Sequence, residues 1–474
     1  MRVMFALICL ISTFSAIGQS VFEVASEYEL TERKAKTYSD KLLNVQDKFQ
    51  GSKKWSKRVK EECQKRSDYF LELNDQHQLM AQGQLTEFIQ SIADRIVNQN
   101  PDLSKRKIKI FVLRNSAVNA HSLGEGIIFF NIGLLARLKD VNELAFILAH
   151  EMAHDVSEHN YISIVKKAKF KDTEEYKELK KASRKKFGSA TALEKMYSKI
   201  FASMGLHSRS NEVVADELGA QYALKAGFSR KGIIRALELL KDSDKPMWTD
   251  SLDIQQLLST PDYAIQTKFL TEVDAYSAWT AMESLHETPD SLRTHPHCEE
   301  RIENVQSKMA NSHDNASELD MIFQSMQTQI LYEYLHTLFE ENNLGRALYF
   351  AMVQKNRGDT SVYLDGLIDI CLFDLAYGIR EQSFSDKCQF PDASYSNGYN
   401  AVLEFAHAQN SKRFLKMANG YFQAHLADAE KFELNNVISL YEKYFNDGFI
   451  RQSDIKKATI KNGFYKELIL QLKQ

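Results

Sequence analysis

The hydrophobic pattern of the first third of the chain predicts a helix, a strand and a hairpin. Apolar residues recur at helical spacing from Gln82 to Val97, and polar and apolar residues then alternate from Lys107 to Val112, as they do in a strand. The segment Asn119 to Asn131 contains the turn signal Gly124-Glu125-Gly126, followed by the short apolar strand Ile127 to Phe130. We expect this segment to form a hairpin near the edge of a small sheet.

The pattern of most of the remaining chain predicts helices. Val141 to Asp155 has neither Gly nor Pro and is apolar on most of its faces, which indicates a buried helix, and Ser208 to Ala226 predicts an amphipathic one. Residues 19–75 are polar and helix-prone. Glu318 to Gln474 has apolar residues at helical spacing and many aromatic residues, which fits either helical repeats or an irregular bundle. The expected fold class is therefore mainly α with a small β-sheet.

The first eighteen residues have the pattern of a signal peptide. Met1 and Arg2 form a short basic start, Val3 to Phe14 is an apolar run, and small residues precede a cleavage site before Gln19. We expect export, with the periplasm as the first choice of compartment and the extracellular space or a membrane surface as the others. The alternative is an uncleaved membrane anchor, although the run is shorter than the roughly 20 residues that a membrane helix needs. No later segment is expected to span a membrane.

Charge and cysteine content narrow the function classes. The chain has 474 residues with 60 basic and 63 acidic side chains, a formal net charge of −3. Such a balance lacks the positive field that nucleic-acid binding needs, so we expect no nucleic-acid partner. Apart from Cys9 in the leader, the cysteines are Cys63, Cys298, Cys371 and Cys388, with no CxxC pair. Two interpretations stay open, a Cys371–Cys388 disulfide or four buried thiols.

The strongest chemical signal is the sequence His150-Glu151-Met152-Ala153-His154. On a helix, positions i and i+4 lie on one face, so both imidazoles can bind one metal ion while Glu151 lies beside its open position. Zinc is the expected ion. The alternative is a pair of core histidines and a solvated glutamate, which is costly on so apolar a helix because buried polar groups need partners.

A catalytic zinc site needs a third protein ligand, and its type separates the possible classes. A metzincin would have a histidine ten positions after His150, where the chain has Asn160, and His159 is off by one. The other common solution is a glutamate from a second helix, and Glu212 in the sequence Glu-Val-Val-Ala-Asp provides it. Asp216, one turn further on, could either support a ligand histidine or donate a proton to the leaving group.

Four segments give the chain a resemblance to a known family. They are NAHSLGEGIIFFNIGLL from Asn119 to Leu135, NELAFILAHEMAH ending at His154, SRSNEVVADELGAQYA beginning at Ser208, and THPHCEERI from Thr294 to Ile302. In this order they resemble the metallopeptidases of family forty-eight, which includes the CAAX prenyl proteases, the HtpX-type proteases and the soluble periplasmic BepA-type proteins. The resemblance covers roughly residues 76 to 310 and implies a zincin-type (gluzincin) peptidase domain.

The resemblance also implies roles for individual residues. In the family, the two histidines of HExxH and the glutamate of ExxxD bind zinc, and these positions are His150, His154 and Glu212. The glutamate of HExxH is the catalytic base, which is Glu151 here. The histidine of the THP sequence is His295, which either lies near the metal or simply belongs to the start of a helix.

Four parts of the chain are expected. They are a signal peptide (1–18), a helical lead-in (19–75), a zinc metallopeptidase domain (76–310) and a helical C-terminal domain (311–474). The lack of later membrane helices favours the BepA-like branch, whose members carry a helical repeat (TPR-like) domain at this end.

The expected function is that of a zinc-dependent endopeptidase with one Zn²⁺ per chain. It would hydrolyse exported or envelope proteins in quality control, with Glu151 as general base and a zinc-activated water as nucleophile. The strand Ile127 to Phe130 is expected to pair with the extended substrate. Expected partners are unfolded or misassembled polypeptides, with the C-terminal domain as a candidate surface for a protein partner. The alternative is a binding or chaperone-like protein with a resting or vestigial zinc site, and hydrolysis of a non-peptide substrate is a third option.

Overall fold

The computed structural model describes Phe22, Val24 and residues 30–174, 176–177, 209–243, 245–267, 298–308, 318–427 and 432–472. The signal peptide, residues 178–208 and His295 lie outside these residues. The chain divides into two units. We call the described residues between 30 and 247, together with 298–337, the sheet unit, and residues 248–267 with those from 338 onward the helical unit.

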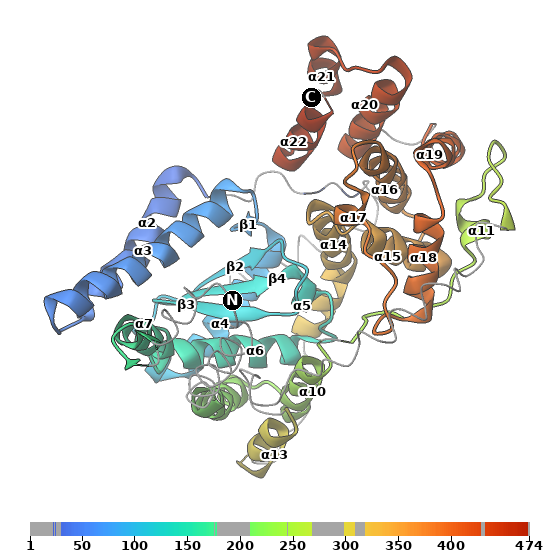
Figure 1. The fold of residues 1–474 in the computed structure, drawn as a ribbon. Helices are drawn as coiled ribbons and strands as arrows, with labels where there is room; N and C mark the ends of the chain where they lie inside the picture. The colour runs from blue at the N-terminus through green and yellow to red at the C-terminus, as the bar shows by residue number, and fades with distance from the viewer. Residues whose placement is uncertain are drawn as a thin grey trace, which may run out of the picture. The chain divides into compact units, whose positions relative to one another are not determined.

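The sheet unit is built around four short strands (Figure 1). They are β1 (Leu79–Met80), β2 (Lys109–Leu113), β3 (Ala120–Gly124) and β4 (Ile127–Asn131). Their order in the sheet is β1-β2-β4-β3, with β2 and β4 parallel and the other two pairs antiparallel. The expected hairpin is present as β3 and β4, but β4 lies inside the sheet and β3 forms its edge. The prediction that Ile127 to Phe130 pairs with substrate is therefore wrong, because both neighbours of that strand are already in place.

Helices cover both faces of the sheet. The helical lead-in forms α2 (Glu32–Leu43), the 3-10 turn η1 (Asn44–Lys48) and α3 (Lys53–Asp75). It packs through residues such as Phe70 on Phe111 and Phe129 of one face. On the alternate positions, Val112 and Phe130 are fully buried at the opposite face, and α4 (Gln84–Gln99) contacts β2 while α6 (Val141–Val156) contacts β3. Figure 1 shows α2 and α3 on one side of the sheet and α6 on the other.

The hairpin turn depends on glycine. Gly124, Glu125 and Gly126 all have positive φ, at 91°, 56° and 77°. A Cβ at Gly126 would lie 2.7 Å from the carbonyl oxygen of Lys107, so a side chain there would collide with the backbone beside β2. The turn holds β3 along the outer edge of β4, where it faces α6.

Further helices complete the sheet unit. They are α5 (Ile132–Leu135), α7 (His159–Phe170), the helical residues 209–225, α10 (Arg230–Lys241), α13 (Cys298–Lys308) and α14 (Glu318–Glu340), whose last residues pass into the other unit, besides the 3-10 turn η2 (Pro101–Leu103). The predicted buried helix is α6, which begins at the N-cap Asp140, whose carboxylate accepts the amide protons of Asn142 and Glu143.

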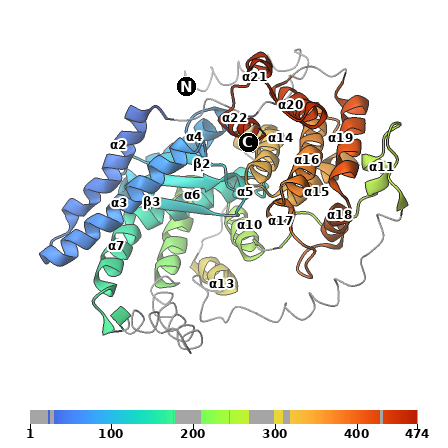
Figure 2. The same cartoon turned by 45° about the horizontal axis from the view of Figure 1, so that its top comes forward.

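The helical unit surrounds α16 (Val362–Arg380). Its other helices are α11 (Ile254–Leu258), α15 (Leu344–Asn356), α17 (Phe384–Lys387), α18 (Asn397–His407), α19 (Ser411–His425), α20 (Glu433–Asp447), α21 (Gln452–Ala458) and α22 (Gly463–Gln471). α16 packs against α15, α19 and α20 (Figure 2). The segment 248–267 belongs to this unit, where Asp250 pairs with Arg357 at 2.8 Å. Helical repeats and the domain bounds 76–310 and 311–474 stay predictions.

The structure tests the expected disulfide and the expected lack of later membrane-spanning helices. Cys63, Cys371 and Cys388 are free, buried thiols, so the proposed Cys371–Cys388 disulfide is wrong. Among the described residues, no helix has the length and apolar character needed to cross a bilayer.

Candidate metal centre

The helix α6 presents two histidines on one face. His150 and His154 are one turn apart, and their Nε2 atoms lie 3.0 Å from each other. Both side chains are largely buried, with 9 % and 16 % of their surface exposed. The i, i+4 spacing therefore brings both imidazoles together, as helix geometry requires.

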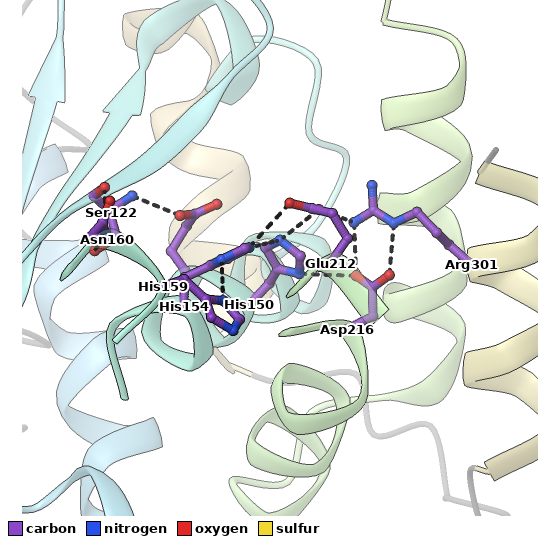
Figure 3. A network of polar contacts seen from close by, with 9 residues as sticks. Ser122, His150, His154, His159, Asn160, Glu212, Asp216 and Arg301 are labelled. Carbon is purple, nitrogen blue, oxygen red and sulfur yellow. Dashed lines mark hydrogen bonds and ion pairs between the residues drawn. The ribbon is translucent and has the colours of Figure 1, made fainter. Parts of the chain in front are cut away.

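Glu212 comes from the second helix, residues 209–225, and meets both histidines. One carboxylate oxygen lies 3.5 Å from Nε2 of His150 and the other 3.5 Å from Nε2 of His154 (Figure 3). Gly219 allows this approach, because a Cβ at that position would lie 2.8 Å from the backbone of His150. The small residue thus lets the two helices pack closely enough for the carboxylate to reach the imidazoles.

These three side chains fit a zinc ion by their chemistry and spacing. Nitrogen and carboxylate donors are typical zinc ligands, with bonds near 2.0–2.1 Å, and a tetrahedron of such bonds has edges of about 3.3 Å. The measured separations of 3.0, 3.5 and 3.5 Å are close to that value. Among the described residues, His150, His154 and Glu212 form a group whose ligand atoms all lie within 4.8 Å of one another.

Asp216 and Arg301 lie behind the metal ligands. Oδ1 of Asp216 is 3.0 Å from Nδ1 of His150. Arg301 of α13 donates to both oxygens of Asp216, at 2.7 and 2.8 Å, and one of its nitrogens is 3.5 Å from Glu212. Figure 3 shows the carboxylate of Asp216 in contact with both the ring of His150 and the guanidinium of Arg301. Of the two roles left open for Asp216, this position favours support of a ligand histidine.

The electrostatics of the metal-free centre follow from these contacts. Burial would lower the pKa of His150, but the carboxylates of Asp216 and Glu212 raise that pKa to about 10. Burial, together with the charge on His150, lowers the pKa of His154 to about 3. Burial would raise the pKa of Asp216, yet Arg301 and His150 hold it below its ordinary value. One proton therefore occupies the histidine pair at neutral pH, where a cation would replace it.

Glu151 is held at the edge strand. Its Oε2 accepts the backbone N–H of Ser122 in β3, at 2.7 Å. The side-chain amide of Asn160 donates in turn to the carbonyl oxygen of Ser122 at 3.1 Å and lies 3.3 Å from its hydroxyl. The carboxylate that follows His150 in sequence is thus fixed by backbone from a different element.

A cavity of about 420 Å³ opens onto these groups. Its lining includes His150, Glu151, His154 and Glu212 together with Ala120 and Ser122 of β3. The same space is therefore bordered by the candidate ligands, the candidate base and the backbone of an edge strand. Such a concave site with convergent polar groups is the usual form of an active site.

Comparison with known proteins identifies the family. Residues 82–309 match the model of peptidase family M48. This segment belongs to that family. Residues 82–309 therefore form a zinc metallopeptidase domain, and the group of His150, His154 and Glu212 is the site in this domain that could hold the ion. No curated protein matches the chain.

The structure brings together the predicted residues of the peptidase and adds others. His150, Glu151, His154 and Glu212 border one cavity, and Asp216 lies directly behind His150. Arg301 was part of the THPHCEERI segment, but nothing in the sequence pointed to its pairing with Asp216.

His159, which lies one position before the expected metzincin ligand, contacts His154 through the two Nδ1 atoms at 2.9 Å. Its spacing from His154 excluded it as a metzincin ligand and gave no other signal. No sequence signal pointed to Ser122 either, because it contacts Glu151 through its backbone N–H.

Proposed function

We propose that this protein is an exported zinc endopeptidase that cleaves unfolded or misassembled exported proteins in quality control. The observation that carries the proposal is the meeting of two imidazoles, a carboxylate from a second helix and Glu151 at one cavity beside an edge strand. The pattern of residues 1–18 supports export.

The residues of the cavity divide the chemistry among them. His150, His154 and Glu212 would hold the ion, which when bound supplies Lewis-acid activation of water and of a carbonyl group at neutral pH. Glu151 takes the proton of the attacking water and returns it to the leaving amine. The amide of Ser122 holds one oxygen of Glu151 and so keeps the carboxylate at the cavity rim.

The substrate backbone pairs with β3 at Ala120. Asn131 donates its N–H to the carbonyl of Asn119, so in the antiparallel ladder the next residue, Ala120, directs its main-chain groups away from β4. Ser122, two residues on, has the same orientation and gives its N–H to Glu151. Ala120 lines the cavity, and its main chain is thus the part of this edge that an extended peptide can use.

Recognition through main-chain atoms supports a role in quality control. A strand added to a sheet edge is selected for being extended, and its side chains matter less than its backbone. Folded proteins seldom offer such a segment, whereas unfolded ones do. The proposed substrate class is therefore defined by conformation more than by sequence.

The first test is the variant Glu151→Gln in the mature protein. We expect it to bind zinc as the wild type does, about one ion per chain, and to lose roughly 10²- to 10⁴-fold in the rate of casein cleavage, because the proton acceptor is gone. Glu212→Ala should lose both zinc and cleavage.

The control is Glu303→Gln, the same change at an exposed position of α13. Undiminished cleavage by Glu151→Gln would remove the proposed mechanism. A zinc-loaded wild type that binds unfolded protein without cleaving it would favour the chaperone-like alternative.

A second test addresses the substrate strand. Ala120→Pro removes one outward N–H from an edge strand, a position that tolerates proline. We expect KM for an unfolded substrate to rise about two- to tenfold, the value of one hydrogen bond, with zinc content unchanged. Ala120→Gly keeps the N–H and serves as the control. An unchanged KM in the proline variant would exclude pairing at Ala120.

A further inference from the structure

Two consecutive residues at the start of α7 reach back to the metal centre. Between α6 and α7 the chain has only Ser157 and Glu158, and Glu158 adopts a left-handed backbone with φ of 53°. Such a conformation is unfavourable for a residue other than glycine. Glu158 is held by ion pairs with Lys48 and Arg106, at 3.6 and 3.5 Å. The sharp turn that results directs His159 and Asn160 toward α6 and β3 (Figure 3).

His159 contacts the nitrogen of His154 that faces away from the metal ligands. The Nε2 atom of His154 faces His150 and Glu212, and its Nδ1 atom lies 2.9 Å from Nδ1 of His159. An imidazole that binds a metal through Nε2 carries its proton on Nδ1. With a metal held at Nε2, His154 would therefore be the donor in this hydrogen bond, and His159 would accept through an unprotonated Nδ1.

The Nδ1 atoms of the two ligand histidines thus have different partners. Nδ1 of His150 faces the carboxylate of Asp216, whereas Nδ1 of His154 faces the neutral acceptor of His159. A partner at this position fixes both the ring orientation and the tautomer of a metal ligand. His159 thus fixes the ring of His154 in the way that Asp216 fixes the ring of His150.

Asn160 acts on the other functional group of the helix. Its side-chain oxygen accepts from Arg66 at 2.6 Å, and its amide donates to the carbonyl of Ser122 at 3.1 Å. Ser122 then gives its backbone N–H to Glu151 at 2.7 Å. A continuous chain of hydrogen bonds therefore runs from α3 through the start of α7 and the edge strand to the general base.

We propose that His159 and Asn160 are two positioning residues with separate tasks. His159 holds His154 for metal binding, and Asn160 holds Glu151 for proton transfer through the backbone of Ser122. The Asn160 half rests on the proposed peptidase function, whereas the His159 half rests on the metal site alone.

The His159 half is tested by zinc affinity of the metal-stripped protein, measured in competition with a chelator. We expect His159→Leu, which keeps bulk but no acceptor, to bind zinc about 10- to 100-fold more weakly. His159→Asn should recover most of the affinity, because its Oδ1 occupies the place of the ring Nδ1 and accepts the same proton. Ile162→Ala, at an exposed position of the same helix, is the control and should bind as the wild type does.

Two results would overturn the His159 half. One is wild-type affinity in His159→Leu, and the other is equal loss in the leucine and asparagine variants, which would point to packing instead of a hydrogen bond. Should His159→Leu not fold, as judged by circular dichroism, His159→Ala replaces it with the same expectation.

The Asn160 half is tested by separating zinc affinity from turnover. Asn160→Asp keeps the shape and the acceptor for Arg66 but has no N–H for Ser122, and Asn160→Ala removes the whole group. We expect both to bind zinc within about twofold of the wild type and to lose about tenfold or more in kcat, with a smaller change in KM, because the base is misplaced.

Full kcat in Asn160→Asp, or a loss of zinc affinity as large as that of His159→Leu, would contradict the separate tasks. If the zinc-loaded wild type cleaves no peptide at all, the proposed function and the Asn160 half both fail. The zinc affinities of the His159 variants decide the other half in either case.

Discussion

Each unit contains a buried aspartate, Asp216 or Asp369, and the two differ in whether a positively charged partner lies beside the carboxylate. In the sheet unit, Asp216 is 2 % exposed and keeps its charge, because Arg301 and His150 surround it and hold its pKa below the ordinary value. In the helical unit, Asp369 of α16 is fully buried, and neither of its oxygens has a hydrogen-bond partner among the described residues. Burial raises its pKa well above the ordinary value, and the nearby Glu442 and Asp365 raise it further.

The neighbours of Asp369 show that the difference is one of partners. Asp365 and Asp374, on the same helix, each have a lysine and a tyrosine as partners, at distances between 2.7 and 3.0 Å. Of these three aspartates, Asp369 is the one with no such partner among the described residues. A buried carboxylate stays ionised only where fixed positive charge replaces the lost water. Asp216 at the metal centre has such a charge beside it, and Asp369 in the core of α16 does not have one among the described residues.

The largest effect is expected from removing the counter-charge of Asp216. Arg301→Met leaves that carboxylate buried with no guanidinium, and breaking a buried pair in this way costs about 3–5 kcal/mol. Urea unfolding of the metal-free protein measures the loss. The double variant Arg301→Met with Asp216→Asn removes both charges and should recover most of the stability. A single variant as stable as the wild type would mean that Asp216 does not depend on Arg301.

The second prediction concerns the pH dependence of Asp369. Because its pKa is raised in the folded state, the folded protein binds more protons than the unfolded chain above about pH 4, so stability falls as pH rises. The contribution is fully present below the unfolded pKa and is lost at about 1.4 kcal/mol per pH unit toward the folded pKa. Asp369→Asn cannot titrate, and its unfolding free energy relative to the wild type should increase with pH.

The measurement is the slope of that difference between pH 5 and 8, because the slope is independent of how well the asparagine packs. Asp386→Asn, at an exposed position of α17, is the matched control. Parallel pH profiles for Asp369→Asn and the wild type would mean that Asp369 has a partner that keeps it ionised.

The smallest effect is expected from removing the negative charge of Asp216 alone, which tests whether that charge assists zinc binding. Asp216→Asn keeps the shape beside His150 but removes the negative charge, and we expect zinc to bind about 10- to 100-fold more weakly. Val214→Ala, at an exposed position of the same helix, should leave zinc affinity unchanged. Wild-type affinity in Asp216→Asn would show that the charge of this carboxylate does not assist the ligand histidine.

The parts of the fold that the sequence could predict depend on short-range geometry. The apolar spacing between Gln82 and Val97 corresponds to α4, and Gly124-Glu125-Gly126 forms the hairpin turn. The hairpin lies at the edge of the sheet as expected, but substrate pairing was assigned to the wrong strand, because the pairing of β4 with β2 cannot be inferred from the hairpin alone. The Cys371–Cys388 disulfide was wrong for a similar reason, because closeness in sequence does not bring two side chains together.

The sequence by itself determined that His150, Glu151 and His154 occupy one helix and that both histidines share a face, because a helix turns by a constant angle per residue. Only the tertiary structure decided which groups surround them. Arg301 binds Asp216, which is 85 residues away in the sequence. Ser122 binds Glu151 through its backbone N–H, a group that nearly every residue type has, so the sequence does not mark this contact. Such contacts arise from the packing of separate elements, and packing depends on the whole core more than on any local pattern.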